Sequence, residues 1–424
     1  MIKLMKNIIY ILVVILGLSA NLQAEWLDEV NAIHAEVRAL TANPEGLSDE
    51  QRLERFYTLS YDRTMLESPG FATYKGDPRG QDRLGDYSAD GIERRRQADR
   101  DALAFLDSID RDSLSGTKRD NYDLLRDNLE RKVNSQRFPV HYMQMTQMNG
   151  PQQDLASLLA MMPNAKPDQL ENQIARMEAF PRYIDENIAL LNAGMEKGVT
   201  PPAITLRDVP QQIRNQLVDD ASKSPLLKGF VEVPATVDPL QAESLRMRAE
   251  QVYSQQDVAA YEKLLEFTES TYLPGARKTI AARDLPDGEA WYQNNVALMT
   301  TTDLTPQQIH DIGLAEVKRI RSEMDVIIES TGFEGSFQEF LHFLRTDPQF
   351  YHTSAEDLMR EYRDISKRAD PELTRLFGVL PRTPYGVIEV PDYAAKSTTT
   401  AYYQAGSLEA GRPGYYFANT YALD

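Results

Sequence analysis

The sequence predicts a mainly α-helical protein, a large multi-helix assembly that leads into a small C-terminal β-sheet. Apolar residues recur about every 3.6 positions through most of the chain, and helix-start signals precede several of these stripes. Near Gly378 the pattern changes to short apolar runs separated by glycine and proline, as in strands. With 424 residues, the chain can form a large core or two to three domains. We expect a signal peptide over residues 1–24, an N-terminal helical region over 25–240, and a helical region over 241–424 that leads into an incomplete sheet.

The N-terminus has the composition of a secretory signal. Lys3 and Lys6 precede an apolar run over 8–18, and small and polar residues follow up to Ala24. The run is shorter than the roughly 20 residues that a membrane-spanning helix needs. We therefore expect export to the periplasm or the medium. The alternative is an uncleaved anchor, because Leu22 is not the small residue that cleavage prefers.

Composition excludes several kinds of protein. The chain has no cysteine, which rules out disulfides, thiolate metal sites, cysteine nucleophiles and a cysteine-linked lipid anchor. Its net charge of −18 argues against nucleic acid and anionic membranes as partners, because both attract cationic surfaces. The strongest basic cluster, Arg94 to Arg96, has acidic neighbours and is predicted to be a solvated helix face.

Three helical stripes are clear in the first 270 residues. One starts near Thr117 and includes Leu124 to Val133, a second covers 170–191 and ends near Gly194, and a third covers 258–267. Pro181 lies inside the second stripe and should kink it or split it in two. Residues 224–239 are proline-rich and are expected to form an exposed loop or linker.

The last 120 residues are predicted to form three helices followed by three strands. Capping patterns at Thr305, Ser336 and Ser354 predict three further helices, the first with Pro306 at its first position. Beyond Gly378, three runs predict strands: 387–390, 399–404 and 415–421.

Common catalytic motifs are absent. The sequence has no H-E-x-x-H, no G-x-S-x-G and no phosphate-binding glycine loop. Asp347 and Pro348 separate the closest pair of histidines, His342 and His352, so a metal site there is less favoured than ordinary surface or core histidines. Carboxylates are numerous, but no spacing singles out an acid–base pair. No catalytic residue and no metal ligand is therefore assigned.

Several segments together resemble the bacterial domain of unknown function 885 family. They are 68–73 (SPGFAT), 82–84 (DRL), 285–292 (LPDGEAWY), 300–306 (TTTDLTP), 309–317 (IHDIGLAEV) and 411–420 (GRPGYYFANT). The resemblance runs from about Trp26 to the last residue. It implies an exported, largely helical metallopeptidase of the zincin type.

In that family the segment matching 412–421 is followed by a helix with an H-E-A-x-P-G-H-H motif, which this sequence does not contain. The resemblance therefore implies the front portion of such an enzyme, inactive by itself, with zinc and a peptide substrate expected only in the complete protein. A non-catalytic helical binding or envelope-scaffold protein is the alternative, and the oligomeric state stays open.

Four residues near the C-terminus are candidate substrate-binding groups. In zincin-type enzymes a strand beside the metal helix often pairs with the substrate backbone, and 415–421 lies where such a strand is expected. Alternation would place Tyr415 and Asn419 on one face and Tyr416 on the other, while Arg412 could bind a carboxylate. A plain core strand with aromatic packing is an equal alternative. We also expect the edge of this strand to be uncovered and to promote association.

Overall fold

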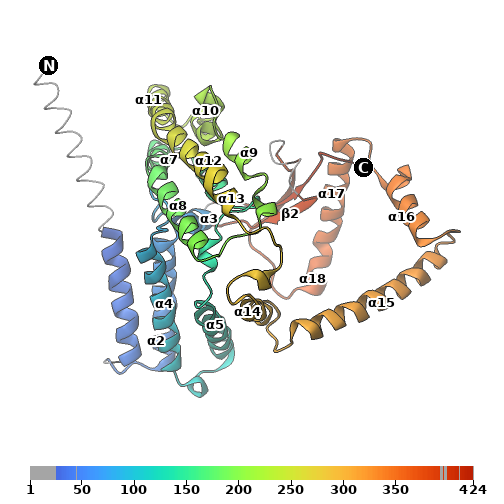
Figure 1. The fold of residues 1–424 in the computed structure, drawn as a ribbon, viewed down its shortest axis with the longest axis horizontal. Helices are drawn as coiled ribbons and strands as arrows, with labels where there is room; N and C mark the ends of the chain where they lie inside the picture. Colours follow the sequence, from blue (N-terminus) through green and yellow to red (C-terminus); the bar gives the residue numbers. More distant parts are fainter. Residues whose placement is uncertain (1–24, 44, 392–394, 396–398, 410, 424) are drawn as a thin grey trace, which may run out of the picture. The chain divides into compact units, whose positions relative to one another are not determined.

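The computed structural model describes residues 25–43, 45–391, 395, 399–409 and 411–423. The signal peptide expected over 1–24 lies outside these residues. The mainly α-helical fold with a small sheet is confirmed, and the chain forms two compact units (Figure 1). Unit 1 ends at Thr301 and unit 2 begins at Thr302. Among the described residues, no helix combines the length and apolar character that crossing a bilayer requires.

Unit 1 begins with a group of long helices around an aromatic core. A first helix covers 25–42 and is followed by α2 (Asp49–Glu67), α3 (Pro69–Lys75), α4 (Ala89–Asp107) and α5 (Gly116–Ser135). Phe56 of α2 stacks on Phe105 of α4 with ring centroids 4.5 Å apart, and both rings are buried. The predicted helix start near Thr117 is confirmed by α5.

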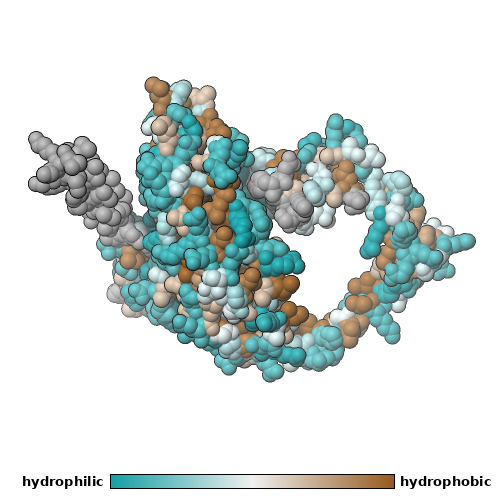
Figure 2. All heavy atoms as spheres, turned by 45° about the horizontal axis from the view of Figure 1, so that its top comes forward, coloured by the Kyte–Doolittle hydropathy of each residue, from teal (hydrophilic) through white to brown (hydrophobic). Residues whose placement is uncertain are grey.

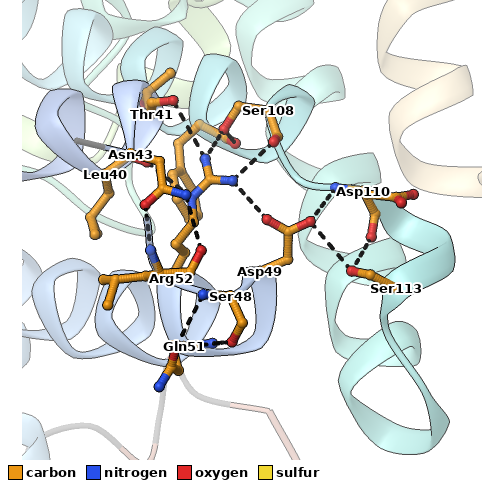
Figure 3. Close-up of polar contacts among 12 residues, drawn as sticks. Leu40, Thr41, Asn43, Ser48, Asp49, Gln51, Arg52, Ser108, Asp110 and Ser113 are labelled. Atoms are coloured by element: carbon orange, nitrogen blue, oxygen red, sulfur yellow. Dashed lines mark hydrogen bonds and ion pairs between the residues drawn. The ribbon is translucent and has the colours of Figure 1, made fainter. Parts of the chain in front are cut away.

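A buried arginine ties three of these helices together (Figure 3). The guanidinium of Arg52 donates to the Leu40 carbonyl at 3.0 Å, to Asp49 Oδ1 at 2.7 Å and to the Ser108 carbonyl at 3.1 Å. The other oxygen of Asp49 accepts from the Asp110 amide at 2.8 Å. Because Arg52 is only 4% exposed, these bonds replace the water that its charge would otherwise need.

The second part of unit 1 packs shorter helices around the largest core of the described chain. This core includes Leu155 of α6, Ile174 of α7, and Phe180 and Ile184 of α8. They belong to the same buried cluster as Tyr261 of α12. The helices are α6 (Pro151–Met161), α7 (Pro167–Glu178), α8 (Phe180–Glu196), α9 (Val209–Arg214), α10 (Lys228–Val231), α11 (Pro239–Val252), α12 (Val258–Phe267) and α13 (Leu273–Gly275). The expected split at Pro181 is confirmed, since α7 ends at Glu178 and α8 starts with Pro181 in its first turn.

Two expectations for this region need correction. Residues 224–231 are not an exposed linker, because Leu226, Leu227 and Phe230 are fully or almost fully buried in the core and the segment includes α10, whereas 232–238 form a largely exposed loop as expected. The sequence-based boundary between 240 and 241 falls inside unit 1, because α11 packs on α7 and α12 packs on α8, as Figure 1 also shows.

Two π-helical turns join α11, α12 and α13 into one continuous helical path. They cover Tyr253–Asp257 and Thr268–Tyr272. Wide turns of this kind are frequent at functional sites, and each one here directs polar side chains into the core. Asp257 and Thr268 are both fully buried.

The last helix of unit 1 is α14 (Gly288–Thr300). Its Trp291 stacks on Phe138 with ring centroids 5.5 Å apart, and together with Val199 and Leu285 the two rings form a separate small core.

Unit 2 starts with α15 (Pro306–Ser330), α16 (Phe337–Thr346), α17 (Ala355–Ala369) and α18 (Leu373–Leu376). The three predicted helix starts are confirmed, since the side chains of Thr305, Ser336 and Ser354 cap α15, α16 and α17. No residue of α15 is buried, although the helix carries large apolar residues such as Val317 and Ile327. In Figure 2, hydrophobic (brown) atoms accordingly lie at the surface along α15.

The three predicted strands form one sheet, but in an order that the sequence did not indicate. The strands are β1 (Tyr385–Glu389), β2 (Ala401–Gln404) and β3 (Gly414–Ala418), and their order is β1-β3-β2. β1 runs parallel to β3 and β2 runs antiparallel to it. The prediction of an uncovered edge at 415–421 is therefore wrong, because β3 is the central strand and both of its edges are hydrogen-bonded.

Candidate functional site

The four predicted substrate-binding residues lie in and around β3 but do not converge on one point. Arg412 lies before the strand, where its backbone pairs with Ser407 in both directions at 2.8 and 2.9 Å. Gly411 adopts a φ of 61° in this turn, a conformation that favours glycine. Tyr415 and Tyr416 point to opposite faces of the sheet, as alternation predicts, and Asn419 lies beyond the end of the strand.

Tyr416 has a packing role. It faces α17, where its ring centroid lies 5.5 Å from that of Tyr362, and it packs on the buried cluster of Met359, Val387 and Ala418. Burial and the neighbouring Tyr362 raise the pKa of Tyr416 above its ordinary value. The alternative of a core strand with aromatic packing fits this face of the sheet.

The opposite face of the sheet is also aromatic. Tyr402 of β2 stacks on Phe417 with ring centroids 4.6 Å apart, and Tyr415 meets Phe417 edge-on at 6.1 Å. The register places Gly386 and Ile388 of β1 on this same face, opposite Tyr415 and Phe417. Tyr415, Phe417 and Ile388 are each half-buried.

Asn419 holds the chain that precedes β2. Its side-chain amide donates to the Ala395 carbonyl at 2.7 Å and to the Thr399 carbonyl at 3.3 Å. Its side-chain oxygen accepts from the Tyr421 amide at 3.0 Å. These bonds account for an asparagine here without a ligand.

A cavity that sequence reasoning did not anticipate lies in unit 1. Its volume is about 570 Å³, and it lies where the start of α3 meets α4, α6 and α8 and the loop before α4. The hydrophobic part of its wall consists of Phe71, Leu84, Leu155, Leu158 and Met161. The polar part includes Glu67, Asp86, Tyr87, Arg95, Gln144, Asp154, Ser157 and Tyr183. We call this cavity the α6 pocket.

A carboxylate and two phenols form the polar floor of the α6 pocket. The Tyr183 hydroxyl donates to Asp154 Oδ2 at 2.5 Å, and the Tyr87 ring meets Tyr183 edge-on with centroids 5.2 Å apart. Burial raises the pKa of Asp154, although the hydrogen bond from Tyr183 opposes this. Burial and the Asp154 charge raise the pKa of Tyr87, while the Arg95 charge lowers it.

The basic cluster on α4 contributes to the same pocket. Arg94 donates to Glu67 and to Asp86 at 2.9 Å each, so its guanidinium is engaged by two carboxylates. Arg96 lies 3.2 Å from His141 Nδ1. Arg95 lines the pocket and has no hydrogen bond or ion pair with the rest of the described chain. The predicted solvated face is therefore wrong, because Arg94, Arg95 and Arg96 are all half-buried.

The partners of this cluster explain why sequence reasoning missed it. Glu67 lies 27 residues before Arg94, and the part of the pocket wall on α6 and α8 lies more than 50 residues further along the chain. The only local signal is the charge run itself.

The described residues do not provide a zinc site. No group of three or more histidine, aspartate or glutamate side chains lies close enough together there to hold a metal ion. His352 Nε2 pairs with Glu361 at 2.6 Å, and burial followed by the charges of Arg96 and Lys197 lowers the pKa of His141 to about 4. The zinc that the family resemblance implies therefore finds no ligand set among these residues.

Comparison with known proteins gives a family and a fold. A model of the family described as "Bacterial protein of unknown function (DUF885)" matches residues 69–424. Solved structures similar to this chain include a crystal structure of "the putative lipoprotein from Colwellia psychrerythraea". The two chains share 20% identity with a TM-score of 0.80, over 89% of this chain and 68% of the other. At this identity the likeness shows a common fold alone. No curated protein matches the chain.

Proposed function

Since the chain belongs to the DUF885 family of bacterial proteins, we propose that it forms the front portion of an exported, zinc-dependent peptidase. In this proposal the described residues contribute to a peptide-binding site, and residues outside those described bind the metal. The sequence motifs that resemble the family over most of the chain support the proposal. No catalytic step is assigned to the described residues, because they include no ligand set for zinc.

The observation that carries the peptide-binding role is the aromatic face of the sheet away from α17. Tyr402 and Tyr415 both contact Phe417 there, and all three keep part of their surface exposed. Aromatic side chains on a rigid strand offer contact area at a low cost in conformational entropy, which suits the apolar side chains of a peptide. Of the four residues proposed from sequence, Tyr415 is therefore the best candidate for binding a substrate.

The test uses the complete natural protein and a set of fluorogenic peptides. Hydrolysis that a zinc chelator abolishes and added zinc restores would support the proposal. Tyr415→Ala should raise KM for peptides several-fold with the fold intact, whereas Tyr421→Ala, an exposed tyrosine beyond the strand, should leave KM unchanged. Absence of hydrolysis of any peptide, in a folded protein supplied with zinc, would refute the proposal.

A non-catalytic binding protein is the second candidate, and the α6 pocket favours it. The pocket is built entirely within unit 1, and its polar groups need no metal ion to bind a ligand. Peptide binding without cleavage by the complete protein would support this alternative over the peptidase.

A further inference from the structure

The α6 pocket has the size of a ligand site. Its volume of about 570 Å³ falls within the roughly 300–1,000 Å³ that is usual for small-molecule sites. Its wall contains the apolar side chains of Leu155, Leu158 and Met161 of α6 together with polar side chains of α4, α6 and α8. Such a mixed wall suits a small ligand with a charged part and an apolar part.

Arg95 supplies an available positive charge at this pocket. Its two neighbours on α4 already have partners, Arg94 with two carboxylates and Arg96 with His141. The half-buried guanidinium of Arg95 has none among the described residues. A guanidinium presents parallel N–H groups that match the two oxygens of a carboxylate.

Asp154 supplies the opposite charge. It accepts a hydrogen bond from Tyr183, but no lysine, arginine or histidine of the described chain pairs with it. Its position in the first turn of α6 favours the ionised form, whereas its burial opposes it. A protonated amine beside Asp154 would remove this conflict by compensating the buried charge.

The two charges act on the same part of the pocket without pairing with each other. Both Asp154 and Arg95 influence the Tyr87 hydroxyl, with opposite effects on its pKa. The carboxylates of Glu67 and Asp86 are less available to a ligand amine than Asp154, because both already accept hydrogen bonds from Arg94. One positive and one negative group that line the pocket therefore have no ion-pair partner in the described chain.

We propose that the α6 pocket binds a small zwitterion, an amino acid or a short peptide, with its carboxylate on Arg95 and its protonated amine on Asp154. The apolar side chain of the ligand would lie against the leucines and methionine of α6. The proposal concerns unit 1 and binding alone, so it does not depend on the peptidase activity proposed above.

The test is calorimetric titration of the 424-residue chain with leucine, with the dipeptide Leu-Leu, and with Leu-Leu acetylated at its amine or amidated at its carboxylate. Leucine or Leu-Leu should bind, and each cap should weaken binding by about tenfold or more. Tighter binding of leucine would identify an amino-acid site, and tighter binding of Leu-Leu a peptide site. Failure of both to bind would overturn the proposal.

Variants then assign each end of the ligand. Arg95→Gln and Asp154→Asn should each weaken Leu-Leu binding by about tenfold. In Arg95→Gln, amidation of the Leu-Leu carboxylate should weaken binding little further, because the partner of that carboxylate is already removed. In Asp154→Asn, acetylation of the Leu-Leu amine should likewise weaken binding little further. Arg100→Gln, on the same helix but outside the pocket, should bind as the wild type does.

Folding is checked for every variant by its thermal unfolding. Arg95→Lys keeps the charge without the fork and should retain part of the affinity, which provides a second variant if Arg95→Gln fails to fold. Wild-type affinity for Leu-Leu in both folded pocket variants, or equal affinity for capped and uncapped ligands, would overturn the proposal.

Discussion

A buried carboxylate in the first π-helical turn should make unit 1 less stable as pH rises. Asp257 is fully buried, and neither of its carboxylate oxygens has a hydrogen-bond partner in the described chain. Burial, and then the charge of Glu178, raises its pKa from 3.8 to about 8. Ionised Asp257 is therefore costly in the folded state, since nothing nearby compensates its charge.

The size of this effect follows from the two pKa values. The unfolded chain releases the proton near pH 4, whereas the folded chain retains it up to about pH 8. Between these values the folded state holds more protons, so the free energy of unfolding falls as pH rises. At about 1.36 kcal/mol for each pH unit, Asp257 alone should lower the free energy of unfolding by roughly 2.5 kcal/mol between pH 5 and pH 7.

The assay compares the wild type with Asp257→Asn by urea unfolding at pH 5 and at pH 7. Both tryptophans, Trp26 and Trp291, belong to unit 1, so their fluorescence follows this unit. Relative to the wild type, Asp257→Asn should gain roughly 2.5 kcal/mol of stability from pH 5 to pH 7, because the amide does not ionise. Histidine titrations occur in both proteins and cancel in this difference.

An exposed aspartate provides the control. Asp219→Asn should change stability little at either pH, because its side chain lies at the surface. A stability difference between the wild type and Asp257→Asn that is the same at both pH values would refute the reasoning.

Two substitutions test the packing of unit 1. Arg52→Ala removes the bonds to Leu40, Asp49 and Ser108 and should lower the free energy of unfolding by roughly 3 kcal/mol, whereas Arg55→Ala on the exposed side of α2 should change it little. Gly194→Ala would place a methyl group 2.7 Å from the Val199 carbonyl and should cost about 1–3 kcal/mol in the same urea assay. Destabilisation by Arg55→Ala as large as by Arg52→Ala, or a neutral Gly194→Ala, would contradict these packing arguments.

Local signals in the sequence predicted where elements begin and end. A hydroxyl side chain at Thr305, Ser336 or Ser354 caps a helix through bonds to residues three positions away, so its role is readable without tertiary structure. Pro181 acts equally locally, because it lacks an amide hydrogen and can be accommodated only in the first turn of a helix.

Candidate site residues were only partly predictable. The alternation of Tyr415 and Tyr416 follows from the geometry of any strand, and the structure confirms it. What each face contacts depends on α17 and on β1 and β2, and these contacts made Tyr416 a packing residue and β3 the central strand.

By itself the sequence determined the mainly helical class, several helix starts and the three strands, because these depend on interactions within a few residues of one another. Only the tertiary structure decided the strand order, the burial of Leu226, Leu227 and Phe230, and the α6 pocket. The strand order depends on the pairing of β1 with β3. The polar part of the pocket depends on pairs such as Arg94 with Glu67, and Tyr183 with Asp154, which lie 27 and 29 residues apart. A charge run looks the same in sequence whether water or distant carboxylates surround it, and only the packing of the helices brings those carboxylates to it.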